Sequence, residues 1–432
     1  MTFLKYAGLI LLVLLLLVLT LIGVLSVTRA HTVKRVISEG DHEGPPHVRD
    51  SLFAKSIELY TGTHIDEGNW VDILLDGEGT YPLLWNDLAA AKNTITVQMY
   101  FSQPGAVADT MAQYLSDRAR AGVRVLLLLD AFGSGPLKQE WIDGLKAAGV
   151  EVAWLRPLRW YTLHQAAQRS HARVVVVDGE VGYTGGFGLA DYWLGDGHSD
   201  GQWRETNVRF GGPTVASLQA AFAAGWVEAT GELITGDRFF PWPALAKRGE
   251  INAGLMHTMP GIGSTPAERF LSISLAGARK TLYIANSYFV PDGNLKRLLI
   301  AAVKRGVDVR VITAGPEGDV KTTWYAGRAM YDELLEGGVR IYEYSPSMMH
   351  AKTMVVDSYW STIGSMNFDN RSISFNNETN IVVLNEGFGQ RMDGIFFDDL
   401  KYSKEIILEE FRKRPLKDKL LSWGAERLWR LL

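Results

Sequence analysis

A duplicated motif constrains the fold of this 432-residue chain more than any other feature of its sequence. The first copy, HARVVVVD, occupies 171–178, and the second, HAKTMVVD, occupies 350–357. Each copy has a cation two residues after its histidine and an aspartate seven residues after it, and Gly185 and Gly364 both follow fourteen residues after the histidine. One such string arises easily by chance. Two copies with matched spacing predict two related halves that face one ligand.

The apolar and β-branched residues of each copy predict a buried strand. Residues two apart in a strand point to the same face, so His350 and Lys352 are expected to project together from the strand's start, as are His171 and Arg173. A histidine can attack or move a proton, and the neighbouring cation supplies fixed positive charge. Asp357 lies near the strand's end, where it is expected to brace the following turn. This combination suits a phosphodiester.

The residues after each strand are candidates for contact with that phosphodiester. Gly185 and Gly186 in the first copy allow the backbone to come close to a ligand. In the second copy Ser365 offers a hydroxyl and Asn367 an amide. All four are predicted to bind substrate.

The paired motifs resemble those of the phospholipase D superfamily, and most closely its bacterial cardiolipin synthase branch. The likeness extends from about Asp72 to Pro415. It is strongest over 350–383, over SYFVPD at 287–292 and over WRETNVRFGGPTVASLQAAFAAGW at 203–226. Two residues depart from the family pattern: Arg173 replaces the usual lysine, and Gly188 replaces the usual asparagine.

The resemblance implies a metal-free and cofactor-free mechanism with a covalent histidine intermediate. The first-copy histidine would attack phosphorus and the second-copy histidine would act as the acid, while the two cations would clamp the phosphate. An acidic residue downstream of each motif would hydrogen-bond a catalytic histidine. The implied catalytic residues are His171, Arg173, Asp178, His350, Lys352 and Asp357, and the implied histidine-orienting residues are Glu205 and Glu378.

Alternating apolar strands and helices predict an α/β fold with a mixed sheet in each half, the two halves forming a pseudo-dimer. The first half is assigned to 51–250 and the second to 251–415. Three pairs of segments support the duplication: 96–101 with 284–289, 122–125 with 306–309, and 149–152 with 338–341. A turn is predicted at 76–79.

The N-terminus carries 21 residues without charge, 7–27. A helix of about 20 such residues spans a bilayer, so 1–30 is predicted to be an uncleaved transmembrane anchor and 31–50 a linker. The distribution of lysine and arginine around the apolar run favours a single-pass protein of the cell membrane with its catalytic part on the cytoplasmic side. The tail, 416–432, is a basic amphipathic helix that either lies on the membrane or packs on the domain.

A net charge of −4 argues against a nucleic-acid partner, and the absence of cysteine excludes a thiolate nucleophile. The favoured function is a membrane-anchored phosphatidyltransferase that makes cardiolipin from two phospholipids, with phosphatidylglycerol as the expected substrate. Three alternatives remain open from the sequence. They are a phospholipase D that uses water, a nuclease, and a non-catalytic lipid-binding protein with a decayed first motif.

Overall fold

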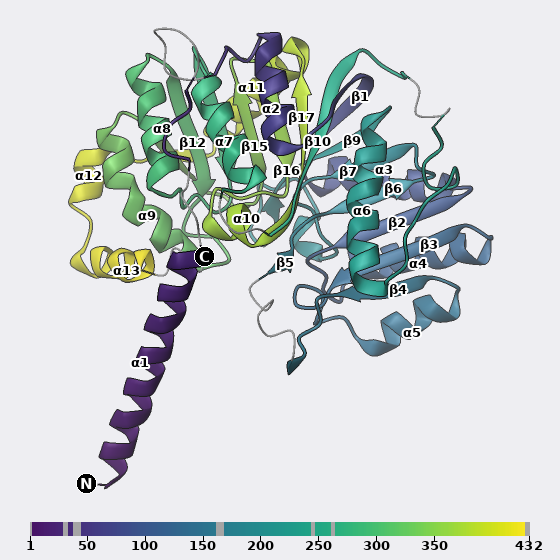
Figure 1. Ribbon diagram of the computed structural model, residues 1–432, viewed down its shortest axis with the longest axis horizontal. Coiled ribbons are helices and arrows are strands. Elements are labelled where there is room, and N and C mark those ends of the chain that lie inside the picture. Colours follow the sequence, from purple (N-terminus) through teal and green to yellow (C-terminus); the bar gives the residue numbers. More distant parts are fainter. Residues whose placement is uncertain are drawn as a thin grey trace.

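Two neighbouring strands, β1 (Ile65–Leu75) and β10 (Ile251–Thr258), pair with each other and join two similar sheets into one. The computed structural model describes residues 2–28, 33–37, 45–160, 168–242, 247–260 and 264–427. Within these residues sixteen strands belong to one continuous sheet, which is flanked by helices (Figure 1). The predicted α/β class with two similar parts is confirmed.

The first half has the strand order β9-β7-β6-β2-β3-β4. Its strands are β2 (Thr94–Met99), β3 (Arg124–Asp130), β4 (Glu151–Leu155), β6 (Val174–Val177), β7 (Val181–Thr184) and β9 (Thr206–Gly211). Its helices are α3 (Asp76–Ala90), α4 (Ala106–Arg120), α5 (Gln139–Ala147), α6 (Thr214–Thr230) and the short η2 (Asp191–Trp193).

The second half repeats this order as β17-β16-β15-β11-β12-β13, with β18 added at the edge. Its strands are β11 (Thr281–Asn286), β12 (Asp308–Ala314), β13 (Arg340–Tyr344), β15 (Lys352–Val356), β16 (Trp360–Gly364), β17 (Asn376–Leu384) and β18 (Ser403–Glu405). Its helices are α7 (Pro266–Gly277), α8 (Gly293–Lys304), α9 (Lys321–Glu336), α10 (Asn370–Ser374), α11 (Glu386–Leu400), α12 (Leu408–Arg412) and α13 (Leu416–Glu426).

Short strands tie the two halves together where the motifs lie. Strand β5 (Arg169–Ser170) of the first half pairs with β17 of the second. Strand β8 (Trp203–Arg204) of the first half pairs with β14 (Met348–Met349) of the second. Each of these strand pairings lies within two residues of a motif histidine or of Glu205. The pairings therefore fix the position of one half relative to the other at the candidate site.

The sheet registers show how the halves correspond. Ile95 of β2 lies opposite Val177 of β6, and Leu282 of β11 lies opposite Val356 of β15. Val177 and Val356 both stand six residues after their histidines, so Ile95 and Leu282 are equivalent. The proposed matches at 122–125 and 149–152 agree with the registers of their strands.

The predicted match of 96–101 with 284–289 is wrong by one residue. The registers make Tyr100 the counterpart of Ser287 rather than of Tyr288. The one-residue error arises because the two segments share a Tyr-Phe pair that lies beyond the end of the paired strands.

The turn predicted at 76–79 is also wrong, because Asp76 begins helix α3. Its carboxylate is buried, accepts the backbone N–H of Glu205 at 2.7 Å and pairs with the Arg204 guanidinium at 3.3 Å. Gly77 is required for a different reason than a turn: a Cβ there would lie 1.9 Å from the carbonyl oxygen of Trp193. Tertiary contacts therefore decide this segment.

Helix α2 (Ser51–Thr61) lies in the part of the sequence assigned to the first half, yet it packs on the second. Phe53 and Ile57 are fully buried in the second half's core, and the Phe53 ring packs edge-on against Trp360 at 5.1 Å. The chain therefore crosses from the second half to the first at about β1.

The N-terminal helix α1 (Thr2–Thr28) projects from the body as a separate rod (Figure 1). Within the described residues, no helix combines the length and apolarity that a membrane crossing requires. At the other end of the chain, α13 packs against α9 and buries Ser422 and Ala425, while Leu416 and Trp423 remain exposed. The last five residues of the predicted tail, 428–432, lie outside the described part of the chain.

Candidate active site

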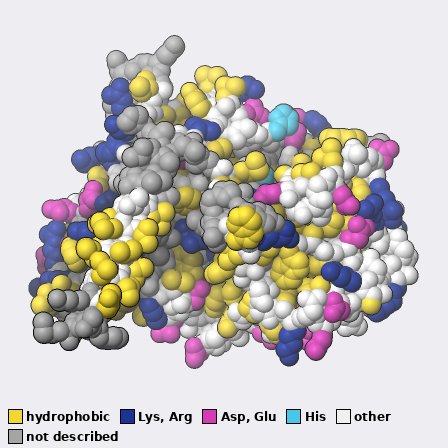
Figure 2. Space-filling model, turned by 60° about the horizontal axis from the view of Figure 1, so that its bottom comes forward, with side chains coloured by type: hydrophobic (Ala, Val, Ile, Leu, Met, Phe, Trp, Pro, Cys, Tyr) yellow, Lys and Arg dark blue, Asp and Glu magenta, His cyan; other side chains and the backbone are white. Residues whose placement is uncertain are grey.

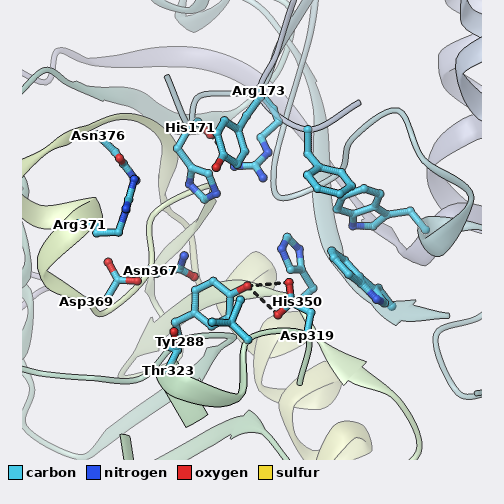
Figure 3. A pocket seen from close by; sticks show the side chains of 15 residues that line it. His171, Arg173, Tyr288, Asp319, Thr323, His350, Asn367, Asp369, Arg371 and Asn376 are labelled. Atoms are coloured by element: carbon cyan, nitrogen blue, oxygen red, sulfur yellow. Dashed lines mark hydrogen bonds between the residues drawn. The ribbon is translucent and has the colours of Figure 1, made fainter. Parts of the chain in front are cut away.

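The two motif histidines meet at one cavity of about 330 Å³ between the halves. His171 lies just before β6 and His350 just before β15, and both line this cavity together with Arg173 and Asn367. Figure 3 shows His171 with Arg173 on one side of the space and His350 on the other. The structure therefore brings the two motifs together as their matched spacing predicts.

Each histidine is held by a glutamate from the opposite half. The Nδ1 atom of His171 lies 2.9 Å from a carboxylate oxygen of Glu378, and that of His350 lies 2.5 Å from Glu205. Both carboxylates are completely buried. This crossed arrangement explains why neither half could build the site alone.

Burial sets the protonation of these pairs. It holds the pKa of both imidazoles well below the ordinary value, and the adjacent cations Arg173 and Lys352 lower those pKa values further. Burial likewise raises the pKa of Glu205 and Glu378 to about 7. An ionised glutamate accepts the Nδ1 proton of a neutral imidazole, which leaves the Nε2 lone pair of each ring available.

The two cations differ in their surroundings. The Lys352 ammonium donates to the Ser287 hydroxyl at 2.6 Å and to the His350 carbonyl oxygen. The Arg173 guanidinium donates to the His171 carbonyl oxygen at 2.5 Å and lies 5.5 Å from the centre of the Tyr100 ring. Burial lowers the pKa of Lys352 to about 7. Arg173 remains the fixed charge of the pair because guanidinium stays protonated in proteins.

Aromatic rings cover the His350 side of the cavity. Trp193 packs edge-on against the His350 imidazole at 5.4 Å, and Trp203 lies at 4.8 Å. The Trp193 indole also donates to Glu205 at 3.3 Å. On the other side Tyr100 packs against His171 at 4.9 Å. The two imidazoles are thus buried against aromatic rings in the cavity wall.

The opposite end of the cavity is polar. Asp369, Arg371 and Asn376 line it, and Figure 3 shows them grouped together on one side of the cavity. Burial raises the pKa of Asp369 to about 6. The Tyr288 hydroxyl, also at the cavity, donates to Asp319 at 2.7 Å. A ligand with hydroxyl groups finds both donors and acceptors here.

A family model described as cardiolipin synthase, PLD-like domain matches residues 84–222 and 271–400, so it covers both halves. The chain belongs to this family. Cardiolipin synthase of Geobacillus kaustophilus is 33% identical over 390 residues, which cover 90% of this chain and 76% of the relative. Cardiolipin synthase A of Pseudomonas putida is 30% identical over 378 residues, covering 84% and 77%. The family member described here is a phospholipase D-type phosphatidyltransferase.

Solved structures show the same fold at much lower identity. Phosphatidylserine synthase of Haemophilus influenzae superposes with a TM-score of 0.65 at 12% identity, covering 88% of this chain and all of that one. Polyphosphate kinase of Porphyromonas gingivalis gives 0.53 at 11% identity, covering 83% and 52%. These likenesses concern the phospholipase D fold alone.

The phospholipase D-type motif aspartates lie away from the cavity. Asp178 accepts the backbone N–H groups of 92–94, and Asp357 accepts those of 279–281, all within 2.6–3.2 Å. They bind the start of the neighbouring central strand, at the opposite end of the motif strand from the histidine. These contacts favour a role in bracing the backbone, which the sequence predicts for Asp357. They do not favour contact with the reacting atoms.

Three of the four predicted substrate-binding residues do not line the cavity: two of them contact or accommodate a glutamate, and Gly185 accommodates an asparagine. The Ser365 hydroxyl donates to Glu378 at 2.5 Å. Gly186 leaves room for Glu205, since a Cβ there would lie 2.2 Å from its carboxylate oxygen, and Gly185 similarly makes room for Asn207. Asn367 alone of the four lines the cavity.

The departure at Gly188 has a steric explanation in this family member. Gly188 corresponds to Asn367, and a Cβ at Gly188 would lie 2.8 Å from the Trp193 ring. Trp193 therefore occupies the space that an asparagine side chain would need, and its indole supplies a donor to Glu205. The first motif thus differs from the second at this position because its glycine leaves room for the Trp193 ring.

Sequence reasoning missed a buried ion cluster behind His350. Arg204 bonds Asp399 of the second half at 2.7 Å and Asp76 of the first at 3.3 Å. Its carbonyl oxygen accepts the His350 backbone N–H at 2.7 Å. The cluster fixes the segment at Glu205, directly after β8, against the segment at His350, directly after β14. The arginine directly before Glu205 in the WRET string was the available signal.

Proposed function

We propose that this phosphatidyltransferase joins two molecules of phosphatidylglycerol into cardiolipin and releases glycerol. The observation that carries the proposal is the crossed pair of glutamate-held histidines at one cavity. Two imidazoles with available Nε2 atoms suit a two-step transfer in which one attacks phosphorus and the other moves protons.

In the first step, Nε2 of His171 attacks phosphorus and a phosphatidyl-histidine forms as the phosphorus–oxygen bond to the head-group glycerol breaks. Protonated His350 gives its proton to that leaving oxygen, and glycerol departs. The negative charge of a bound phosphodiester favours the imidazolium that the empty site disfavours. Arg173, Lys352 and Asn367 would contact the non-bridging oxygens.

In the second step, neutral His350 takes a proton from a glycerol hydroxyl of the second phosphatidylglycerol. The resulting oxygen attacks phosphorus, the bond to His171 breaks, and cardiolipin forms. The polar end of the cavity at Asp369, Arg371 and Asn376 suits the glycerol hydroxyls that enter and leave. The aromatic rings beside His350 supply apolar surface, which supports a lipid acceptor.

The proposal includes attachment to the cell membrane through α1, with the catalytic body on the cytoplasmic side. The apolar side chains of 9–19 on this helix are 47–71% exposed, so they have no partner surface on the described body. An apolar surface of this size gains free energy by leaving water. Arg29, Lys34 and Arg35 follow the apolar run, whereas only Lys5 and the amino terminus precede it. This excess of positive charge supports placing the catalytic body on the cytoplasmic side.

The test is incubation of the purified full-length protein with phosphatidylglycerol that carries isotope in its head-group glycerol. Cardiolipin and free glycerol in equal amounts are expected, and His171→Ala protein serves as the inactive control. Phosphatidic acid with glycerol as the main products would establish hydrolysis instead. No lipid product from a folded protein that binds phosphatidylglycerol would contradict both reactions.

A further inference from the structure

Exposed apolar side chains surround the mouth of the site on one edge of the sheet. Phe132 is 63% exposed, Leu158 57%, Trp160 85% and Val320 39%; these four residues are called the rim. They follow the C-terminal ends of β3, β4 and β12. The motif histidines lie at this same edge, because β6 and β15 run antiparallel to the central strands and begin here.

Two of the rim residues are connected to the cavity by contacts. Val320 lines the cavity directly. The Arg169 guanidinium lies 5.4 Å over the Phe132 ring, and Arg169 pairs in the sheet with Asn376, which also lines the cavity. Val320 therefore belongs to the cavity wall and Phe132 lies near it through Arg169, while Leu158 and Trp160 follow β4, which pairs with β3.

The opposite edge of the sheet differs. Among the described residues, none of the exposed large apolar side chains lies in its loops at 121–123, 148–150, 305–307 and 337–339. The loops of the catalytic edge are longer, as at 131–138 and 315–320, and they carry Phe132 and Val320. At the opposite edge the segment 238–241 packs on Gly122 and Gly179, and Trp242 beside it is exposed. At the catalytic edge four exposed apolar side chains follow the ends of strands that lead to the site, which indicates a partner there.

Exposed charged residues alternate with the rim: Lys138, Arg159 and Lys321 are basic, and Glu317 and Asp319 beside Val320 are acidic. Tryptophan and other apolar side chains mixed with lysine and arginine are typical of surfaces that rest in the interfacial layer of an anionic membrane. Figure 1 shows α1 leaving the body on its lower side. Figure 2 brings that side forward and shows hydrophobic side chains of the body interspersed with basic ones beside α1.

We propose that the rim docks the catalytic body onto a bilayer that contains phosphatidylglycerol, so that the cavity opens onto the lipid head groups. This inference rests on the proposed function, since it names the source from which the site takes its lipid. Helix α1 supplies attachment, while the rim supplies orientation. A lipid then moves from bilayer to cavity without exposing its acyl chains to water.

The chain contains no cysteine, so a single introduced cysteine can carry an environment-sensitive label. Full-length Trp160→Cys and Leu158→Cys proteins are labelled with a fluorophore and reconstituted into vesicles of phosphatidylcholine and phosphatidylglycerol. We expect a blue shift and quenching by lipids with quenchers in the upper acyl chain. Ala121→Cys, exposed at the opposite edge, is the matched control and should remain in water.

A second measurement separates docking from chemistry. The variant Leu158→Ser/Trp160→Ser should turn over vesicle phosphatidylglycerol at least about tenfold more slowly, and soluble short-chain phosphatidylglycerol at the wild-type rate. Labels at 158 and 160 that stay in water, or equal losses on both substrates, would overturn docking and leave the proposed function intact. Buried labels with no lipid product from any form would refute the proposed function and retain the docking surface.

Discussion

The two halves of this enzyme hold their histidines alike and their cations differently. In both, a buried glutamate from the other half lies against Nδ1 of the histidine, at 2.9 Å for Glu378 and 2.5 Å for Glu205. In the second half the cation is a lysine bonded to the Ser287 hydroxyl. In the first it is Arg173 over the Tyr100 ring. Because Tyr100 and Ser287 are equivalent in register, cation and partner have changed together.

This comparison shows which parts of a duplicated site resist change. The glutamate contact must be kept twice because each histidine needs a fixed tautomer and orientation. The cation needs only to place positive charge near the phosphate oxygens, and lysine or arginine can do so if the neighbouring side chain suits it. We therefore propose that Arg173 replaces the lysine functionally.

The largest expected effect concerns the histidines. His171→Ala and His350→Ala should each lower transfer by about 10²–10⁴ or more, since each removes a positioned nucleophile or acid. With a substrate analogue whose leaving group needs no acid, His350→Ala should still form an acid-labile phospholipid–protein adduct, whereas His171→Ala should not. Mass spectrometry of the trapped protein measures this. An adduct on His171→Ala protein would exchange the two roles.

The crossed contacts give the next effect. Glu378→Gln and Glu205→Gln should each lower kcat/KM by about 10²-fold, because the amide can no longer accept the Nδ1 proton as a full charge. Double-mutant cycles should couple Glu378 with His171 and Glu205 with His350. Stronger coupling between each glutamate and the histidine of its own half would contradict the crossed site.

Replacing the cation of the first motif is expected to lower kcat by a smaller factor. Arg173→Lys should lower kcat about tenfold, because a lysine there lacks the hydroxyl that Ser287 offers Lys352. Adding Tyr100→Ser should restore most of the loss. Arg173→Gln, which removes the charge, should lose far more, about 10²–10³-fold. Tyr100→Phe is the matched control and keeps the ring face. Additive losses in the double variant would show that the two positions are independent.

The same difference predicts a pH dependence. Burial lowers the pKa of Lys352 to about 7, so its ammonium is present below that pH and is lost above it, while Arg173 keeps its charge. The kcat/KM of the free enzyme should therefore fall on the alkaline side of about pH 7. Lys352→Arg should remove this alkaline decline even if its overall rate is lower. An unchanged decline would assign the titration to another group.

The sequence predicted the parts of the molecule that local patterns encode. The buried run of β3 and the matched motif spacing gave the α/β halves and the shared cavity correctly. The crossing of Glu205 and Glu378 could not be predicted, since it depends on how the halves dock. The one-residue error at Tyr100 and the mistaken turn at Asp76 have a related cause: pairing registers and buried charges decide these positions, and neither appears in local composition.

The smallest expected effect on activity concerns the motif aspartates, where the halves again correspond. Asp178 and Asp357 each accept three backbone N–H groups at the far end of the motif strand, and Asp357 also lies 2.8 Å from His47. Replacing either carboxylate by an amide weakens hydrogen bonds from exposed and part-buried backbone donors, which costs about 0.5–1.5 kcal/mol.

Asp178→Asn and Asp357→Asn should therefore lower the Tm of detergent-solubilised protein, with the larger decrease for Asp357 because it has one more partner. The turnover of the molecules that remain folded should stay within about twofold of wild type, because neither carboxylate lines the cavity. Differential scanning of unfolding together with turnover per folded molecule makes the distinction. A fall of 10²-fold or more at an unchanged Tm would place these carboxylates in the chemistry. The bracing geometry instead requires stability to change while catalysis does not.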